Sequence, residues 1–100
     1  MYQKLDPSQV NQHLQALNQL CPAQPWQIKD GKLHKAYQFK NFKTCFAFMT
    51  HVALMAEQLN HHPEWMNVYH QLTIDLITHK VNALTDLDFR LATMMEKIEI

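Results

Sequence analysis

Three histidines, His61, His62 and His79, stand where polar side chains from separate parts of the chain could meet. The pair His61-His62 directly follows an apolar segment typical of a helix, and Pro63 ends any helix there and favours an extended backbone at His62. His79 follows an alternating segment typical of a strand, at a point where strand gives way to loop. We therefore expect the three imidazoles to converge on one site.

Imidazole side chains titrate near neutral pH, which suits them to proton transfer without a metal ion. Reactions that expel a poor leaving group such as hydroxide need such transfer most, so the histidines point to a hydratase or dehydratase. Plainer interpretations stay open, because surface histidines are common and three histidines could bind zinc. Adjacent imidazoles rarely face one ion, however, and the helical spacing of a zincin is absent. Covalent catalysis is not indicated, since Cys45 falls in an apolar helical stripe and no nucleophile signature occurs.

The composition restricts the function further. One hundred residues with 47% hydrophobic content are enough for one domain, residues 1–100, with its own core. A formal charge of zero argues against direct binding to nucleic acid.

The start of the chain lacks the apolar core of a signal peptide and no stretch is long enough to span a bilayer, so we expect a cytoplasmic protein. Cys21 and Cys45 are then expected to be free thiols, and the single glycine, Gly31, excludes phosphate-binding loops. Neither a cofactor nor a metal is predicted.

Local signals place the first elements. Asp6 and Gln9 form the capping box of a first helix. Asp30-Gly31 predicts a tight hairpin with Ile28 opposite Leu33, and its alternating strands have one apolar face that helices should cover. The predicted apolar face holds Trp26, Ile28, Leu33, Tyr37 and Phe39.

The second helix is expected over residues 41–59, and its apolar arc divides into two sectors. The first sector holds Phe42, Cys45, Phe46, Met49, Ala53 and Ala56. The second sector holds Phe48, Val52, Met55 and Leu59. A deeply buried helix would explain both, but so wide an arc exceeds what one sheet face can bury. A subunit interface on this helix is therefore favoured.

The rest of the chain is expected to form two strands and a third helix. The strands are predicted at residues 65–69 and 72–76, although His70-Gln71 carries no turn chemistry to separate them. Thr85 opens the last helix. The order α-β-β-α-β-β-α predicts an α+β fold.

Several motifs occur together at specific intervals: His61-His62-Pro63-Glu64-Trp65, then Thr78-His79, then Leu84-Thr85 with Asp88. Around them stand Trp26, Glu57, Asn67-Val68-Tyr69 and Leu91-Ala92. In this combination, which covers nearly the whole chain beyond the first helix, the sequence resembles the pterin-4a-carbinolamine dehydratase family. The resemblance implies a four-stranded antiparallel sheet with three helices on one face, and assembly as a homodimer or homotetramer, for which the second helix is the expected contact.

The resemblance also implies the reaction, which is loss of water from a 4a-hydroxytetrahydropterin to give a quinonoid dihydropterin. The substrate would come from an aromatic amino acid hydroxylase. Carried onto this chain, the catalytic residues are His61, His62 and His79, with His61 and His79 expected to transfer protons and His62 to orient the pterin. The expected substrate-binding residues are Trp26, Glu57, Pro63 and Asp88.

Most of these binding residues also have a plainer interpretation. Trp26 is equally well explained as a core residue, Glu57 as a solvated side chain, and Asp88 as part of the cap of the last helix. One segment departs from the family pattern, because Lys80-Val81-Asn82-Ala83 stands where a pair of glycines is usual. Asn82 tolerates a left-handed backbone but Ala83 does so poorly, which leaves the conformation beside His79 open.

Two other functions stay open. Some relatives of that family also act as dimerisation cofactors for a transcription factor through the exposed side of the second helix. The residues that would serve that role here are Phe48, Val52, Met55 and Leu59. The third interpretation is a histidine-bound metal enzyme.

Overall fold

The computed structural model describes residues 2–99; Met1 and Ile100, the ends of the predicted 1–100 domain, lie outside the described residues. Its elements follow the order α-β-β-α-β-β-α, as predicted. They are α1 (Pro7–Asn18), β1 (Gln27–Lys29), β2 (Lys32–Gln38), α2 (Phe42–Leu59), β3 (Glu64–Val68), β4 (Gln71–Leu76) and α3 (Asp86–Glu96).

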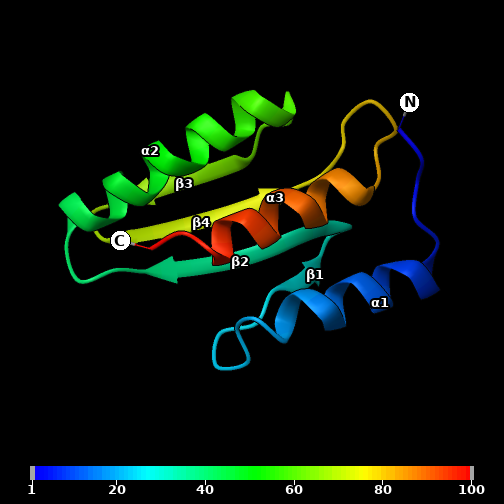
Figure 1. Ribbon diagram of the computed structural model, residues 1–100, viewed down its shortest axis with the longest axis horizontal. Coiled ribbons are helices and arrows are strands. Elements are labelled where there is room, and N and C mark those ends of the chain that lie inside the picture. The colour runs from blue at the N-terminus through cyan, green and yellow to red at the C-terminus, as the bar shows by residue number, and fades with distance from the viewer. Residues whose placement is uncertain (1, 100) are drawn as a thin grey trace.

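The four strands form one antiparallel sheet in the order β1-β2-β4-β3, with the three helices side by side on one face (Figure 1). The expected pairing of Ile28 with Leu33 is confirmed. Because β4 is central, Asp75 lies directly between His34 of β2 and Glu64 of β3. The end of β4 and the start of β3 therefore meet at one end of the sheet, which is where His61, His62 and His79 lie.

Caps within the chain explain where the helices begin. The predicted capping box of Asp6 with Gln9 is present, with the Gln9 amide 2.8 Å from Asp6 Oδ1. Asn41 caps α2 by accepting from the Thr44 amide at 2.8 Å. Thr85 caps α3 in a second capping box, with Asp88 as its acidic member. Each cap satisfies amides that the first helical turn leaves without a partner.

The core lies between the helices and the covered face of the sheet. On that face Trp26 and Leu33 are buried and Tyr37 and Phe39 pack against the core, as the alternation predicts, whereas Ile28 on the edge strand β1 is exposed. Cys21 and Cys45 are free thiols, as expected. Within residues 2–99, none of the helices combines the length and apolar character needed to cross a bilayer.

The orientation of α2 corrects one interpretation of the sequence. Phe48 and Val52 of the second sector are buried, and Met55 and Leu59 pack against the core, so these four do not form an exposed binding surface. The exposed apolar side chains instead include Phe42 and Phe46 of the first sector. Helical periodicity defines the width of an apolar arc but does not say which side meets the sheet.

The turn between β3 and β4, which the sequence left unplaced, falls at Tyr69-His70. Tyr69 takes a left-handed backbone with φ of 54°. The side-chain amide of Asn67 donates to the carbonyls of Tyr69 at 3.1 Å and Gln71 at 2.9 Å. Asn67 therefore supplies the turn chemistry that is missing from the turn residues themselves.

Candidate functional site

A pocket of about 240 Å³ lies where the segment after α2, the loop after β4 and the start of the chain meet. The structure brings His61, His62 and His79 together there, although up to eighteen residues separate them in the sequence. The lining residues are Tyr2, Asn60, His61, His62, Ile77, Thr78, His79 and Lys80.

The end of α2 determines where His61 stands. Asn60 ends the helix in a left-handed conformation with φ of 50°, which asparagine tolerates better than most residues. The His61 amide then turns back to the Ala56 carbonyl at 3.0 Å. This closure of the last helical turn buries the His61 ring, which is only 8% exposed.

Asp88 connects this ring to two other segments of the chain. Its Oδ1 lies 2.6 Å from His61 Nε2, while its Oδ2 accepts from the Thr78 hydroxyl and the Thr85 amide, both at 2.9 Å. The Thr78 and Thr85 hydroxyls also contact each other at 2.7 Å. A single buried carboxylate thus joins the end of α2, the end of β4 and the start of α3.

His62 has a different carboxylate partner. Its Nε2 lies 2.5 Å from Glu57 Oε2, on the last turn of α2, and both side chains are more than half exposed. The contact joins Glu57, one of the expected substrate-binding residues, to the rim of the pocket through His62. Pro63 follows at once, and β3 begins at Glu64.

His79 stands on the tight loop that follows β4. Thr78 and Ala83 form an isolated bridge across this loop, with the Thr78 amide 3.0 Å from the Ala83 carbonyl. Asn82 takes the left-handed conformation, with φ of 51°, so the loop closes without the glycines that are usual in the resembled family. The His79 side chain is 67% exposed, and its Nε2 lies 3.0 Å from Glu64 Oε2.

The same pairing therefore occurs three times around one pocket. Carboxylate oxygens only accept hydrogen bonds, so a neutral imidazole that bonds to one through Nε2 carries its proton there and has a lone pair on Nδ1. An imidazole in this form takes up a proton at Nδ1, and in its protonated form it donates one from the same atom. The pocket thus holds groups of the kind that general acid–base catalysis uses.

Trp26, one of the expected substrate-binding residues, lies outside the pocket and is instead a core residue, as its plainer interpretation has it. Its side chain is 1% exposed, and its Nε1 donates to Glu96 Oε2 at 3.0 Å. Lys35 Nζ lies 2.7 Å from the same oxygen, and the Tyr37 hydroxyl donates to it as well. Trp26 is therefore part of a buried polar cluster near the C-terminal end of α3, whereas Asp88 and the pocket lie at its N-terminal end.

The pocket also holds Tyr2 and Lys80, which no pattern in the sequence marked as site residues. Tyr2 reaches the pocket because the Leu5 amide pairs with the Leu84 carbonyl at 3.0 Å, which holds the start of the chain against the loop after β4. Lys80 Nζ lies 5.4 Å from the centre of the Tyr2 ring. Tyr2 thus brings an aromatic side chain to the pocket, which Trp26 does not.

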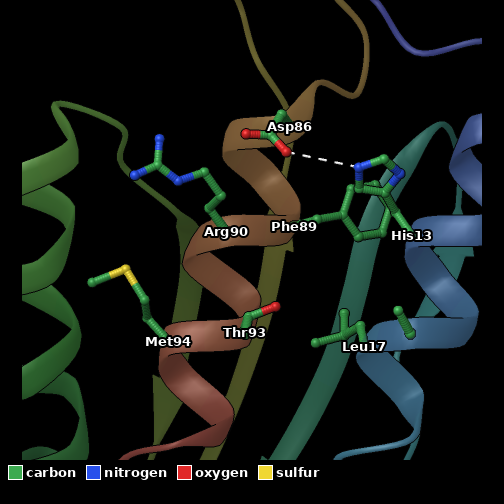
Figure 2. A pocket seen from close by; sticks show the side chains of 8 residues that line it. His13, Leu17, Asp86, Phe89, Arg90, Thr93 and Met94 are labelled. Atoms are coloured by element: carbon green, nitrogen blue, oxygen red, sulfur yellow. Dashed lines mark ion pairs between the residues drawn. The ribbon is translucent and has the colours of Figure 1, made fainter.

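A separate groove lies between α1 and α3. Figure 2 shows His13 of α1 beside Phe89 of α3, with Asp86 at the start of α3 directed towards the imidazole. His13 Nε2 lies 3.7 Å from Asp86 Oδ1.

Across residues 2–99 no three His, Cys, Asp or Glu side chains are arranged to hold a metal ion.

Comparison with known proteins relates this geometry to a family. A family model described as pterin 4 alpha carbinolamine dehydratase matches residues 3–98. A Solibacter usitatus protein named pterin-4-alpha-carbinolamine dehydratase is 51% identical over 73 residues, which is 73% of this chain and 77% of that protein. A Rhizobium rhizogenes protein of the same name is 44% identical over 98 residues, or 96% of this chain and 91% of that protein.

A solved structure agrees in fold as well as in sequence. The crystal structure of a transcriptional coactivator/pterin dehydratase from Brucella melitensis has a TM-score of 0.83 and 40% sequence identity, covering 93% of this chain and 95% of that one. This chain therefore belongs to the pterin-4a-carbinolamine dehydratase family.

Proposed function

We propose that this protein removes water from a 4a-hydroxytetrahydropterin and releases a quinonoid dihydropterin. One observation carries the proposal: three imidazoles, each with Nε2 within 3.0 Å of an oxygen of its own carboxylate, lie around one pocket. The volume of about 240 Å³ is slightly below the roughly 300–1,000 Å³ of most ligand pockets. That size suits a flat two-ring heterocycle whose substituent extends into solvent.

The reaction needs one proton taken and one proton given. A base removes the proton from a ring nitrogen, an acid protonates the neighbouring hydroxyl, the C–O bond breaks, and a C=N bond forms as water leaves. We assign the base to His61, since Asp88 holds its Nε2 as a donor and leaves the Nδ1 lone pair for the substrate. We assign the acid to His79, because its exposed ring can regain a proton from solvent after each turnover.

His62 then orients the substrate. Its ring is held by Glu57 at the rim of the pocket, one residue from the base. Pro63 supports this arrangement by restricting the backbone of His62. We propose that Pro63, Glu57 and Asp88 act through the histidines that they adjoin, and that Tyr2 provides the aromatic contact with the pterin.

Dehydration of a chemically prepared 4a-hydroxytetrahydropterin tests the assignment, with the uncatalysed rate subtracted. His61→Ala and His79→Ala should each lower kcat by about 10²- to 10⁴-fold, the usual contribution of a positioned acid or base. His62→Ala should mainly raise KM. His51→Ala, at an exposed histidine of α2, is the control and should behave as the wild type. The assignment is wrong if the His61 and His79 variants match this control.

We further propose that the substrate comes from a tetrahydropterin-dependent aromatic amino acid hydroxylase in the cytoplasm. The support is chemical, because such a hydroxylase uses dioxygen: one oxygen atom enters the aromatic amino acid, and the other stays on the tetrahydropterin as the 4a-hydroxyl. Adding the protein to a working hydroxylase reaction should shorten the lifetime of the 4a-hydroxypterin, measured by its absorbance. A lifetime that does not depend on the amount of protein would contradict this source.

We also propose a homo-oligomer whose contact includes α2. Phe42 and Phe46 are 47% and 52% exposed, and their ring centres lie 5.5 Å apart on one side of the helix. Exposed aromatic rings of this kind are enriched at subunit interfaces. Phe46→Asp should lower the mass measured by light scattering, whereas Gln58→Asp, at another exposed position of α2, should not. An unchanged mass for Phe46→Asp would place the contact elsewhere.

A further inference from the structure

The uncovered face of the sheet carries a row of charges that leads to His79. Glu64 of β3 lies directly opposite Asp75 of β4, and like charges in such a pair destabilise a sheet. Two basic side chains of β2 offset the repulsion. His34 Nδ1 lies 2.8 Å from Asp75 Oδ1, and Lys32 Nζ lies 2.6 Å from Glu64 Oε1.

Each oxygen of Glu64 therefore has its own partner. While Oε1 accepts from Lys32, Oε2 lies 3.0 Å from His79 Nε2. The hydrogen bond from Lys32 holds the pKa of Glu64 below its ordinary value, with a smaller contribution from the charge of His79. Glu64 thus stays ionised at neutral pH, and it faces His79 as a pure hydrogen-bond acceptor.

Stability alone does not explain this arrangement. The side chains of Lys32, Glu64 and His79 are 34%, 39% and 67% exposed, and ion pairs this exposed contribute only about 0–1 kcal/mol. Two carboxylates placed face to face break a local rule of sheet design, which proteins tend to do where function requires it. The functional explanation is that Glu64 orients the His79 ring. His79 stands on a loop, and without this contact its exposed ring is free to rotate.

We propose that Glu64, held in place by Lys32, is a positioning residue for His79. Lys32 reaches Glu64 across the central strand β4, so the sheet fixes the position of the Glu64 carboxylate. The carboxylate in turn fixes the orientation of the His79 ring. With Nε2 bound to Glu64, Nδ1 of His79 is directed to the substrate. The inference rests on the proposed function, in which His79 transfers a proton, and extends it to residues that lie outside the pocket lining.

The kinetic test compares Glu64→Gln, Lys32→Met and Lys32→Arg with the wild-type protein. Lys32 and His79 meet different oxygens of Glu64, and an amide keeps only one of the two, so Glu64→Gln should lower kcat by about 10- to 100-fold, the cost of a misplaced catalytic group, and leave KM nearly unchanged. Lys32→Met should lower kcat in the same direction, and Lys32→Arg, which keeps the charge, should restore it. Asp86→Asn, at an exposed carboxylate that pairs with His13 (Figure 2), is the matched control and should leave kcat unchanged.

A second measurement needs no substrate. In protein labelled with ¹⁵N-histidine, the ring-nitrogen signals of His79 should move in Glu64→Gln and in Lys32→Met but not in Asp86→Asn. Wild-type kcat in Glu64→Gln, or unmoved His79 signals, would overturn the proposal. If the signals move but the wild type dehydrates no 4a-hydroxypterin, the proposed function fails while the positioning of His79 by Glu64 is supported.

Discussion

Replacing Asp88 by asparagine changes the partner of His61 while keeping the shape of the side chain. Asp88 accepts from three donors: His61 Nε2 at 2.6 Å, the Thr78 hydroxyl at 2.9 Å and the Thr85 amide at 2.9 Å. In Asp88→Asn the carbonyl oxygen can still serve Thr78 and Thr85, which directs the amide NH₂ at His61. Two donors then face each other, so the ring must move its proton from Nε2 to Nδ1.

That exchange of tautomer removes the lone pair that the substrate needs. We expect kcat to fall by about 10²- to 10⁴-fold, because a His61 ring without this lone pair no longer acts as a base. One hydrogen bond to a charged group contributes about 2 kcal/mol, so the melting temperature should fall by about 10 °C in a domain of this size. The dehydration rate, thermal unfolding and the ring-nitrogen signals of His61 measure the three effects separately.

Thr78→Val is the matched control for this prediction. It removes a different donor to Asp88 and leaves the contact with His61 in place. We expect a loss of about 1–2 kcal/mol in stability but a kcat close to that of the wild type. The reasoning is refuted if Asp88→Asn keeps kcat within a few-fold of the wild type, or if Thr78→Val lowers kcat as much as Asp88→Asn does.

Three further predictions concern Tyr2 and the buried cluster around Glu96. Tyr2→Ala should raise KM several-fold with little change in kcat, because an aromatic contact contributes about 0.5–1.5 kcal/mol to binding. Steady-state kinetics measure both constants. Lys35→Met should cost about 3–5 kcal/mol in urea unfolding, since it leaves the Glu96 carboxylate buried without its cation. Burial opposes ionisation of Glu96, but the hydrogen bonds from Lys35, Tyr37 and Trp26 outweigh it and keep the pKa of Glu96 below its ordinary value of 4.5. As the pH falls below 4.5, the unfolded chain therefore binds a proton at Glu96 before the folded chain does. The free energy of unfolding of the wild type should then approach that of Glu96→Gln. Unfolding curves recorded across this pH range measure the difference.

Each of these predictions has an outcome that contradicts it. Unchanged KM in Tyr2→Ala would exclude contact between this ring and the pterin. A loss below 1 kcal/mol in Lys35→Met would mean that water enters and solvates Glu96. A constant stability difference between the wild type and Glu96→Gln from neutral pH to pH 3 would show that this carboxylate titrates alike in the folded and unfolded chains.

The parts of the fold that the sequence predicted correctly depend on neighbours a few residues apart. The capping box at Asp6 and the hairpin at Asp30-Gly31 are of this kind, and so is the start of α3 at Thr85. The turn at Tyr69-His70 escaped prediction because its stabilising group, the amide of Asn67, lies outside the turn.

The parts of the site that the sequence did not predict depend on contacts between distant segments. Trp26 meets Glu96, seventy residues away, and no local pattern reports that contact. The role of Glu64 was equally hidden, since the residue follows His62-Pro63 directly but its partners are Lys32 and His79. That the three histidines meet at one pocket was predictable, because they stand at helix and strand ends, where side chains from separate segments tend to collect.

The capping box of α3 has a consequence for how this protein tolerates change. One oxygen of Asp88 helps to begin the helix and the other contacts the ring of His61, so a single carboxylate belongs both to the helix cap and to the candidate site. A library of variants that is screened only for soluble, well-folded protein should therefore retain Asp88. The variants that pass this screen should also keep the orientation of His61, although the screen does not measure activity. Glu64, on an exposed strand, has no such protection and would be lost first.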